Sequence, residues 1–263
     1  MGRRLGGRRK GALSKAMTPR ILHAGDSCLV VEFGNSIDMG INARVQALRG
    51  EIEKRPFRGF IEAIPTYRSL SVCFDPLIVC EGLDELLLTL AKSAESARVD
   101  DDKRKLLVVP ACYEGDYAPD LETVATSSGI STDEVIRRHS ANDYYCYMLG
   151  FVPGYPYLGG MDPALETPRL KTPREKIPAG SVAIGGKQTG IYPIDSPGGW
   201  NIIGKTPLCM FNPARNPAIF LEAGMWVRFV PISAEEFERM AVDAARQDWR
   251  PDIREETISK EAP

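Results

Sequence analysis

The stretch from Gly150 to Phe211 most constrains the fold, because glycine, proline and aromatic residues alternate along it. It begins Gly-Phe-Val-Pro-Gly-Tyr-Pro-Tyr-Leu-Gly-Gly and later reads Ser-Pro-Gly-Gly-Trp-Asn-Ile-Ile-Gly-Lys-Thr-Pro. Glycine adopts backbone conformations that are closed to other residues, and proline fixes φ and removes a hydrogen-bond donor. Flexible linkers combine Gly and Pro with Ser, Glu or Lys and lack aromatic side chains. The segment is therefore predicted to form rigid loops that wall a pocket.

One part of this segment, Gly199–Thr206, matches the phosphate-loop pattern of Gly, four residues and then Gly-Lys-Thr. That motif binds phosphate where a buried strand precedes it and Gly-Lys-Thr opens a helix. Here the turn Asp195–Gly198 precedes the match and Pro207 follows it at once, before the strand-like Leu208–Phe211. We therefore expect these residues to run from a turn into a strand, and we reject the phosphate loop.

The bulk composition is that of a soluble globular protein. The chain has 263 residues, of which 43% are hydrophobic and 26% charged, with a formal net charge of -2. The length allows one large domain or two of ordinary size. The charge gives no general attraction to nucleic acid, and no apolar run approaches the ~20 residues that span a membrane. A cytoplasmic protein that binds neither nucleic acid nor membrane is predicted.

The cysteines and histidines argue against a metal site. Six cysteines are scattered without a Cys-x-x-Cys motif, and the chain has two histidines. Structural zinc sites need four Cys or His ligands at characteristic spacings. The sequence therefore predicts free, mostly buried thiols and no bound metal.

Residues 1–20 differ from the rest of the chain. They carry seven Lys and Arg residues, no acid and many glycines. The apolar core of a secretory signal is absent. A disordered basic tail is predicted, with a nucleic-acid-binding arm as the alternative, and Met17 is a second candidate start.

Residues 21–109 are predicted to form a small α+β domain. Ile37, Ile41, Val45, Leu48 and Ile52 recur at helical spacing and mark the first helix. The expected order is strands at Ile21–Ala24 and Cys28–Phe33, a helix from Ser36, strands at Phe60–Ile64 and Leu70–Phe74, a helix at Asp84–Arg98 with Leu86, Leu87, Leu90 and Ala91 inside, and a strand at Lys105–Val109.

Residues 110–250 read as a mainly-β domain, followed by a tail over residues 251–263. Helices are predicted at Ala118–Ser127, from the capping box Ser131–Glu134 to His139, and at Ser233–Arg246 as a closing helix. Short strands separated by turn residues suggest a barrel or sandwich. They are expected at Tyr144–Phe151, Ser181–Gly185, Thr189–Ile194, Trp200–Ile203, Leu208–Phe211, Ala218–Glu222 and Trp226–Pro231.

No arrangement of residues by itself names a reaction. His139 is the only histidine outside the first strand, so a Ser-His-Asp relay would need it, and a structural role at a helix end is the alternative. Five cations lie among the glycines and aromatics: Arg169, Arg174, Lys176, Lys187 and Lys205. Arginine presents a planar fork that suits carboxylate or phosphate. The pattern favours an acidic small ligand, with Arg174 as the strongest candidate.

A series of motifs carries a family resemblance. They are His139, Tyr145–Gly160, Pro168-Arg169, Pro173-Arg174, Ile177–Ile184, Gln188–Pro193, Ser196–Trp200 and Gly204–Pro207, with Gly25-Asp26, Val31–Gly34, Glu62–Tyr67 and Phe74–Pro76 in the N-terminal half. Over roughly residues 19–235 they resemble the B-subunit family of bacterial 5-oxoprolinase. The family is also labelled allophanate hydrolase subunit 1, and its first-described member is a sporulation histidine-kinase inhibitor.

The resemblance implies a small α+β domain followed by a cyclophilin-like β-barrel. It implies a non-autonomous member of an ATP-dependent lactam hydrolase complex, which opens 5-oxo-L-proline to L-glutamate with two partners, a homologous C subunit plus an A subunit. ATP would be shared with a partner, and Mg²⁺ would accompany the ATP. The alternatives are an allophanate hydrolase or urea carboxyltransferase type of subunit, and an inhibitor of a histidine kinase.

The expected site joins these motifs in one cleft at the mouth of the barrel. His139 and Arg174 are the candidate catalytic residues, and Arg174 and Gln188 would meet the carboxylate and the lactam amide. The candidate ligand-binding residues are Phe151, Pro153, Gly154, Tyr155, Tyr157, Arg169, Gln188, Tyr192, Gly198, Gly199, Trp200 and Lys205. Lys205 stands where many relatives carry Arg, which would weaken bidentate anion binding there. Cys146 stands where Val is common.

Overall fold

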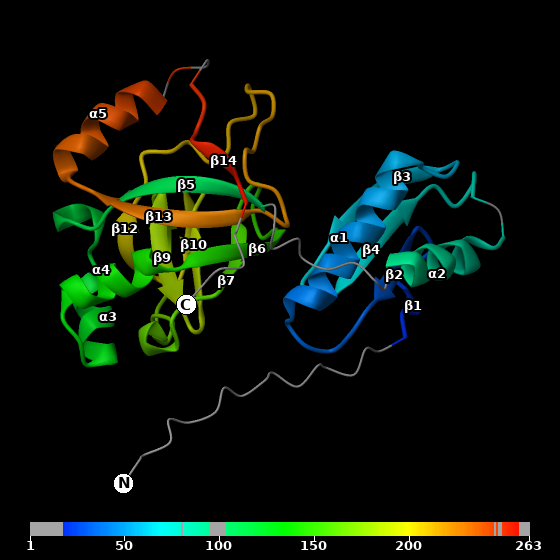
Figure 1. Cartoon of the computed structure of the whole chain (residues 1–263), viewed down its shortest axis with the longest axis horizontal. Coiled ribbons are helices and arrows are strands. Elements are labelled where there is room, and N and C mark those ends of the chain that lie inside the picture. The colour runs from blue at the N-terminus through cyan, green and yellow to red at the C-terminus, as the bar shows by residue number, and fades with distance from the viewer. Residues whose placement is uncertain (1–17, 80, 95–103, 245, 247–248, 258–263) are drawn as a thin grey trace, which may run out of the picture. The chain divides into compact units, whose positions relative to one another are not determined.

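The computed structural model of the chain describes residues 18–79, 81–94, 104–244, 246 and 249–257 (Figure 1). The basic tail predicted over residues 1–20 lies almost wholly outside the described residues. The described residues form two compact units, one within residues 18–64 and 68–94 and the other within residues 65–67 and 104–257. Each unit has its own hydrophobic core.

The N-terminal unit is the α+β fold that the sequence predicts. Its antiparallel sheet has the order β1-β2-β4-β3, and the helices α1 and α2 pack on one face of it (Figure 1). The elements are β1 (Arg20–His23), β2 (Cys28–Glu32), α1 (Met39–Lys54), β3 (Phe60–Pro65), β4 (Ser69–Phe74) and α2 (Leu83–Ser93). Strand alternation buries every second side chain of β2 and β4 under the helices.

Local sequence explains both helices of this unit. The Asp38 side chain caps α1 by accepting a hydrogen bond from the Ile41 amide at 2.9 Å. The predicted apolar face of α1 is buried from Ile41 to Ile52. In α2, Leu87 and Ala91 are fully buried, but Leu86 is 41% exposed, so its predicted place on the inner face is wrong. The predicted end of this helix at Arg98 lies outside the described residues.

The second unit is the predicted β-barrel. Its strands are β5 (Arg104–Cys112), β6 (Asp143–Leu149), β7 (Pro156–Gly159), β9 (Ser181–Gly185), β10 (Gln188–Ile191), β12 (Asn201–Lys205), β13 (Trp226–Ile232) and β14 (Ile253–Glu256). The order is β12-β9-β10-β7-β6-β13-β5-β14, and β12 also pairs with β5, which closes the sheet. The short strands β8 (Arg174–Ile177) and β11 (Ser196–Gly198) form a separate pair.

Two predicted boundaries are corrected by strand β5. The run Lys105–Val109 was expected to close the first domain, but it lies in β5, which pairs in parallel with β13 from Leu106 to Cys112. Residues 251–263 were expected to be a tail, but β14 pairs with the first half of β5. An apolar strand satisfies its backbone in whichever sheet offers an edge, and its sequence does not say which.

The segment between β12 and β13 also differs from its prediction. Leu208–Phe211 and Ala218–Glu222 form no strands and share one isolated bridge, Phe211 with Ile219. The Arg215 side chain, and not a neighbouring strand, supplies hydrogen bonds to this segment. Its guanidinium donates to the carbonyl oxygens of Cys209, Pro217 and Ala218. The same group stacks on Phe220, with 3.7 Å between its Cζ and the ring centroid.

The helices of the second unit agree with prediction in position. They are α3 (Leu121–Ser128), α4 (Thr132–Ala141) and α5 (Ala234–Ala244), with single 3₁₀ turns at Gly115–Tyr117 and Pro163–Leu165. The Ser131 side chain accepts from the Glu134 amide at 3.2 Å, as a capping box requires. The Glu134 carboxylate does not complete the box, because it pairs with Arg137 and Arg138.

A network of four charges fastens β14 to the barrel. Arg228 binds Asp143 through two hydrogen bonds of 2.7 and 2.8 Å. Arg104 donates to both Asp143 and Glu256, and Arg228 also reaches Glu256. The side chains of Arg104 and Asp143 are only 11% and 18% exposed. Burial raises the pKa of Asp143, but the two guanidinium groups outweigh burial and hold that pKa below its usual range.

Asp143→Asn is therefore expected to lower the free energy of unfolding by about 1–3 kcal/mol, because it leaves two arginines short of a partner. The carboxyl pKa of the folded state is depressed, so this stabilisation is present above the unfolded pKa of about 3.8 and is lost as pH falls below it. Urea unfolding at several pH values measures both effects. The matched control is Asp252→Asn, whose pair with Arg254 is about half exposed; its effect is expected within about 0.5 kcal/mol. Equal effects of the two variants would contradict the assignment.

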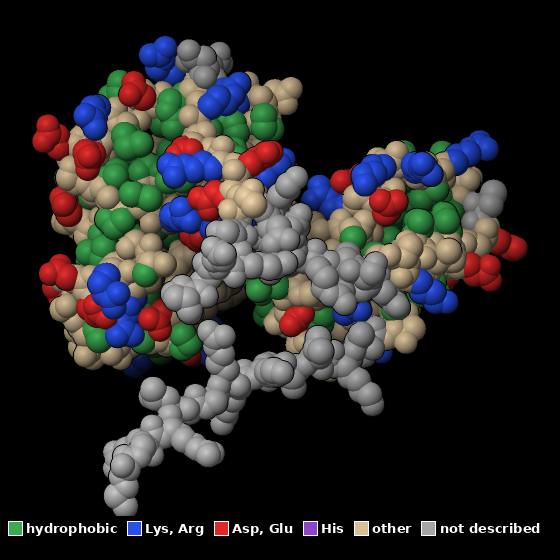
Figure 2. All heavy atoms as spheres, viewed as in Figure 1, with side chains coloured by type: hydrophobic (Ala, Val, Ile, Leu, Met, Phe, Trp, Pro, Cys, Tyr) green, Lys and Arg blue, Asp and Glu red, His purple; other side chains and the backbone are tan. Residues whose placement is uncertain are grey.

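The surface offers no extended region of one charge on the face drawn in Figure 2, where basic and acidic side chains are interspersed over each unit. This agrees with the net charge of -2. Of the helices that the structure describes, none has the length and apolar character needed to cross a membrane.

Candidate functional site

The second unit contains a cavity of about 340 Å³, which the two predicted aromatic loops enclose. Its lining consists of Phe151, Tyr155, Tyr157, Arg169, Pro173, Tyr192, Pro197, Gly198, Gly199 and Trp200. Pockets for small ligands usually have this mixture of aromatic faces and a few polar groups. The structure thus brings together most of the sequence-predicted ligand-binding residues.

The first wall is the turn between β6 and β7. The Gly150 amide donates to the Tyr155 carbonyl oxygen at 3.0 Å and closes the turn. Phe151 has a φ of 63°, a left-handed conformation that is uncommon for an aromatic residue, and its side chain is 64% exposed at the cavity. Gly154 has a φ of 82°, which suits glycine. The turn therefore holds Phe151 toward solvent in a defined conformation.

Tyr155 is the centre of the aromatic cluster. Its ring lies in edge-to-face contact with Phe151, Tyr157, Tyr192 and Trp200, with centroids 5.2–5.8 Å apart. Edge-to-face pairs at this distance are favourable beyond their buried area. The pocket wall is therefore formed before any ligand arrives.

The second wall is the turn at residues 197–200, where glycine lets aromatic side chains pack closely against the backbone. A Cβ at Gly198 would overlap the Tyr192 hydroxyl oxygen, and a Cβ at Gly185 would lie 2.6 Å from the Trp200 ring. The Leu170 amide donates to the Gly199 carbonyl oxygen at 2.7 Å and ties the Arg169 segment to this turn. The glycines noted in the sequence therefore allow aromatic rings to pack directly on backbone.

Arg169 is the cation of the cavity. Its guanidinium lies over the Trp200 ring, with 5.7 Å between Cζ and the centroid. The residue is exposed and makes no hydrogen bond or ion pair with any other residue that the structure describes. A guanidinium that stacks through its face keeps its N–H groups available for an anion.

Two of the phenols of the lining, those of Tyr155 and Tyr192, remain protonated at neutral pH. Burial raises the pKa of both Tyr155 and Tyr192, although the nearby charge of Arg169 opposes this. Both hydroxyls are therefore poor bases at neutral pH.

Arg174 does not line the cavity, which corrects its predicted role as the carboxylate-binding residue. Its Nη2 donates to the Asp120 Oδ1 at 2.7 Å, and Nη1 lies 3.5 Å from the Trp200 carbonyl oxygen. The Asp120 Oδ2 accepts from the Ile202 amide at 2.7 Å. Arg174 and Asp120 therefore fix the backbone on either side of Asn201, directly after Trp200. Asp120 was missed in the sequence, since it fell inside the predicted helix Ala118–Ser127.

Four other predicted residues also lie outside the lining of the cavity. Gln188 donates a hydrogen bond to the Tyr67 hydroxyl and is absent from the lining, so it is not placed to meet a lactam amide in the cavity. Lys205 has its Nζ 6.0 Å from the centroid of Phe237 on α5. Pro153 and Gly154 shape the first turn without lining the cavity, whereas Pro173 lines it and was not predicted.

The rejection of the phosphate loop is confirmed. Gly204 and Lys205 belong to β12, which follows the turn at residues 199–200, and no helix begins at Thr206. A Cβ at Gly204 would lie 2.9 Å from the Cys112 carbonyl oxygen, so this glycine serves strand packing at the closure of the barrel.

His139 lies in the barrel core, which corrects its prediction as a catalytic residue. It has no exposed surface, so no substrate can touch it in this structure. Nδ1 lies 2.8 Å from the Tyr113 hydroxyl and Nε2 lies 2.8 Å from the Thr189 hydroxyl. The Thr189 hydroxyl donates to the Ala183 carbonyl oxygen, so it accepts from a proton on Nε2 of the neutral ring. Burial lowers the pKa of His139 to about 3.

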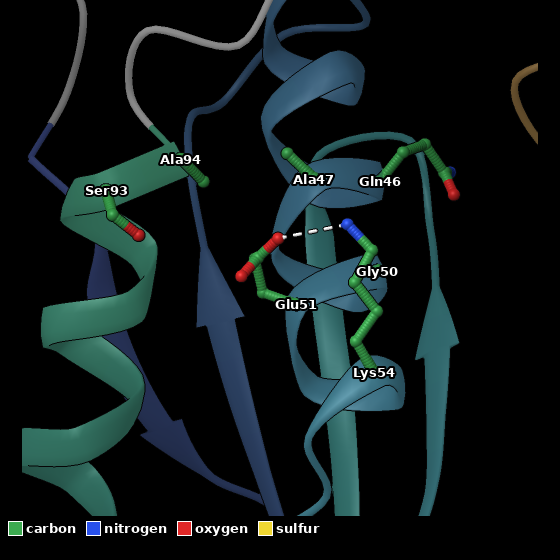
Figure 3. Close-up of a pocket in the computed structure, with 7 residues that line it drawn as sticks. All are labelled: Gln46, Ala47, Gly50, Glu51, Lys54, Ser93 and Ala94. Atoms are coloured by element: carbon green, nitrogen blue, oxygen red, sulfur yellow. Dashed lines mark hydrogen bonds and ion pairs between the residues drawn. The ribbon is translucent and has the colours of Figure 1, made fainter.

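A second hollow lies in the N-terminal unit between α1 and α2 (Figure 3). It measures about 510 Å³ and is lined by Gln46, Ala47, Gly50, Glu51, Lys54, Ser93 and Ala94. Lys54 and Glu51 point toward one another and form an ion pair of 3.2 Å, so the only cation of the lining is neutralised. The hollow is a weaker candidate than the aromatic cavity. Among the described residues no group of three or more His, Cys, Asp or Glu side chains could hold a metal ion.

Comparison with known proteins places this site in a family. The model of the carboxyltransferase domain, subdomain C and D, matches residues 19–221. The B subunit of 5-oxoprolinase from Bacillus subtilis (strain 168) is 44% identical over 227 residues, which cover 83% of this chain and 95% of that protein. The corresponding B subunit of Escherichia coli O157:H7 is 36% identical over 211 residues, or 79% of this chain and 93% of that protein.

Solved structures share the fold. TTHA0988 superposes with a TM-score of 0.69 at 35% identity, covering 79% of this chain and 40% of that longer chain. The urea amidolyase of K. lactis gives a TM-score of 0.71 at 23% identity, covering 92% of this chain and 16% of that chain, a likeness of fold alone. The chain belongs to the family of the carboxyltransferase domain, subdomain C and D, and within it to the B subunits of 5-oxoprolinase.

Proposed function

We propose that the chain is the B subunit of an ATP-dependent 5-oxoprolinase, which opens 5-oxo-L-proline to L-glutamate. It acts with two partners, a homologous C subunit plus a lactam-hydrolase A subunit. The B-subunit relatives match almost along their whole length, at 44% and 36% identity. The observation that carries the proposal is the aromatic cavity with Arg169, which has no ion pair among the described residues.

The cavity suits a small ring that bears a carboxylate. Its volume of about 340 Å³ is near the lower end of the usual range for ligand pockets. Arg169 can bind the carboxylate through its fork while it stacks on Trp200. The hydroxyls of Tyr155 and Tyr192 can hydrogen-bond to the lactam group, and the aromatic faces cover the ring carbons.

The cavity by itself supplies binding and no catalytic set. Its titratable lining residues are three tyrosines and Arg169, so the described lining offers neither a carboxylate nor an imidazole as general base. A reaction site needs a nucleophile or base in hydrogen-bond reach of the substrate. We therefore expect the chain alone to be inactive and its partners to supply the reacting groups.

ATP fits a shared site better than a site on this chain alone. The segment that matches a phosphate loop is a turn and a strand, so it lacks the helix N-terminus on which phosphates rest. We propose that ATP, with its Mg²⁺, binds where a partner in the complex adds phosphate-binding groups.

Reconstitution tests the proposal. The chain, its homologous partner and the lactam-hydrolase partner are purified separately, and glutamate release from 5-oxo-L-proline is measured with and without ATP. We expect release only from the complete, ATP-supplied mixture. Full activity of the isolated chain would contradict its dependence on partners. If the mixture turned over allophanate and not 5-oxo-L-proline, allophanate would be the substrate instead.

A further inference from the structure

Two cysteines face each other across the central strands of the N-terminal unit. Cys28 on β2 and Cys73 on β4 are direct partners in the strand register. Their Sγ atoms lie 3.6 Å apart and are not bonded. Both residues are half-buried. Directly opposed side chains of antiparallel strands point to the same face, so the two thiols meet without any rearrangement of the sheet.

The backbone at this position suits a disulfide. The neighbouring pair is joined by the Phe74 amide, which donates to the Ser27 carbonyl oxygen at 2.9 Å. Because hydrogen-bonded and non-hydrogen-bonded pairs alternate, Cys28 and Cys73 form a non-hydrogen-bonded pair, whose Cα atoms are typically about 4.5 Å apart. Disulfides span Cα separations of roughly 4.4–6.8 Å. Side-chain rotation alone can therefore bring the two sulfurs to bonding distance.

The thiols of Cys28 and Cys73 are accessible to a small oxidant. The next opposed pair along the strands, Leu29 and Val72, points into the core under the helices, so the two thiols lie on the opposite face of the sheet. By contrast, Cys112 and Cys146 are fully buried, and the thiol of Cys209 lies against the Phe211 carbonyl oxygen. Among the cysteines that the structure describes, Cys28 and Cys73 are the pair in thiol–thiol contact.

Cys73 is the donor of the pair, because its Sγ–H donates to the Cys28 Sγ. Burial, followed by the neighbouring Cys28, raises the pKa of Cys73 to about 11. Cys73 therefore keeps its proton at neutral pH, and thiolates are the reactive form. The Cys28 sulfur, which accepts this hydrogen bond, is therefore assigned the first reaction with an oxidant, and Cys73, 3.6 Å away, closes the bridge.

We propose that Cys28 and Cys73 are a peroxide-sensitive modification site that forms a reversible cross-strand disulfide. The Cys28 sulfur attacks one oxygen of hydrogen peroxide, the O–O bond breaks and water leaves, so that Cys28 becomes a sulfenic acid. The Cys73 sulfur then displaces the sulfenic hydroxyl, which leaves as a second water with the Cys73 proton. The two thiols lose two electrons, and these reduce the peroxide to two waters.

The disulfide stabilises the folded N-terminal unit. It joins the two central strands of the sheet and closes a loop that contains α1 and β3. A disulfide around a long loop stabilises the folded state by restricting the unfolded chain. A dithiol reductant reverses the bond by thiol–disulfide exchange. The N-terminal unit thus has a reduced form and a more resistant oxidised form.

The test uses the full chain, treated with a small molar excess of hydrogen peroxide and then freed of it. We expect the intact mass to fall by two hydrogens. Proteolysis should give one linked pair of peptides, and cleavage at Asp75 separates Cys73 from Cys80 so that the bridge is assigned. The midpoint of thermal unfolding of the N-terminal unit should rise by about 5 °C or more and return after reduction.

Variants make the outcome decisive. Cys73→Ser should stop at a sulfenic acid on Cys28 that a 1,3-dione reagent labels, and it should show no thermal shift. Cys28→Ser should show neither label nor shift, whereas the control Cys209→Ser should behave as wild type. A bridge that involves Cys80 or Cys209, a disulfide between two chains, or direct over-oxidation of Cys28 in the wild type would each overturn the proposal.

Discussion

Replacing Arg169 by alanine is expected to lower kcat/KM of the assembled 5-oxoprolinase by roughly tenfold to a thousandfold. Arg169 is the cation of the cavity lining; it stacks on Trp200 and has no ion pair with another residue that the structure describes. The loss of a charged hydrogen-bond donor from a binding site costs about 1.5–3 kcal/mol or more. The cation contributes little to the core, so the thermal midpoint should stay near that of wild type. Steady-state glutamate release over a range of 5-oxo-L-proline concentrations measures the effect.

Three further variants locate the cause. Arg169→Lys keeps the charge but loses the planar fork, so an intermediate loss is expected. Arg239→Ala removes an exposed arginine of α5 outside the cavity lining and should leave kcat/KM unchanged. Arg174→Ala should instead lower the thermal midpoint, because its partner Asp120 would lose its ion pair. A wild-type rate for Arg169→Ala would show that the substrate carboxylate does not bind in this cavity.

Replacing His139 by alanine is expected to destabilise the second unit by about 3–5 kcal/mol. The substitution leaves a cavity in the barrel core and removes a partner from the Tyr113 and Thr189 hydroxyls. His139→Gln keeps a donor and an acceptor and should cost less. The control is His23→Ala, since His23 is 70% exposed beside Asp84, and a change within about 0.5 kcal/mol is expected. Chemical unfolding measures these differences, and equal costs at His139 and His23 would contradict the buried role.

The same histidine predicts a dependence on pH. Its pKa is about 3 in the folded state and near 6.5 in an unfolded chain, so below pH 6.5 the unfolded state binds the extra proton. Stability should therefore fall as pH falls from about 6.5 to 3, with a slope approaching about 1.4 kcal/mol per pH unit from this group. His139→Gln should lack that component. Nitrogen NMR should find the single ring proton of His139 on Nε2 at neutral pH. A doubly protonated, positively charged ring at pH 6 would refute the lowered pKa.

Patterns between close neighbours predicted most elements of the fold. The alternation in β2 and β4, the apolar period of α1 and the Ser131 cap of α4 depend on residues a few positions apart. The same holds for the aromatic loops, because glycine and proline act on their own backbone. The predicted strands Leu208–Phe211 and Ala218–Glu222 were wrong, and Arg215, which lies between them, instead donates to one carbonyl oxygen of each segment.

The sequence by itself determined that rigid aromatic loops would wall a pocket and that Gly199–Thr206 would enter a strand. Only the tertiary structure decided which cation serves that pocket. Arg169 and Arg174 look alike in sequence, but Asp120, 54 positions away, engages Arg174. Likewise Arg104 meets Glu256 across 152 positions, which makes a barrel strand of the expected tail. A side chain's role depends on the partners that folding brings to it, and no local pattern records them.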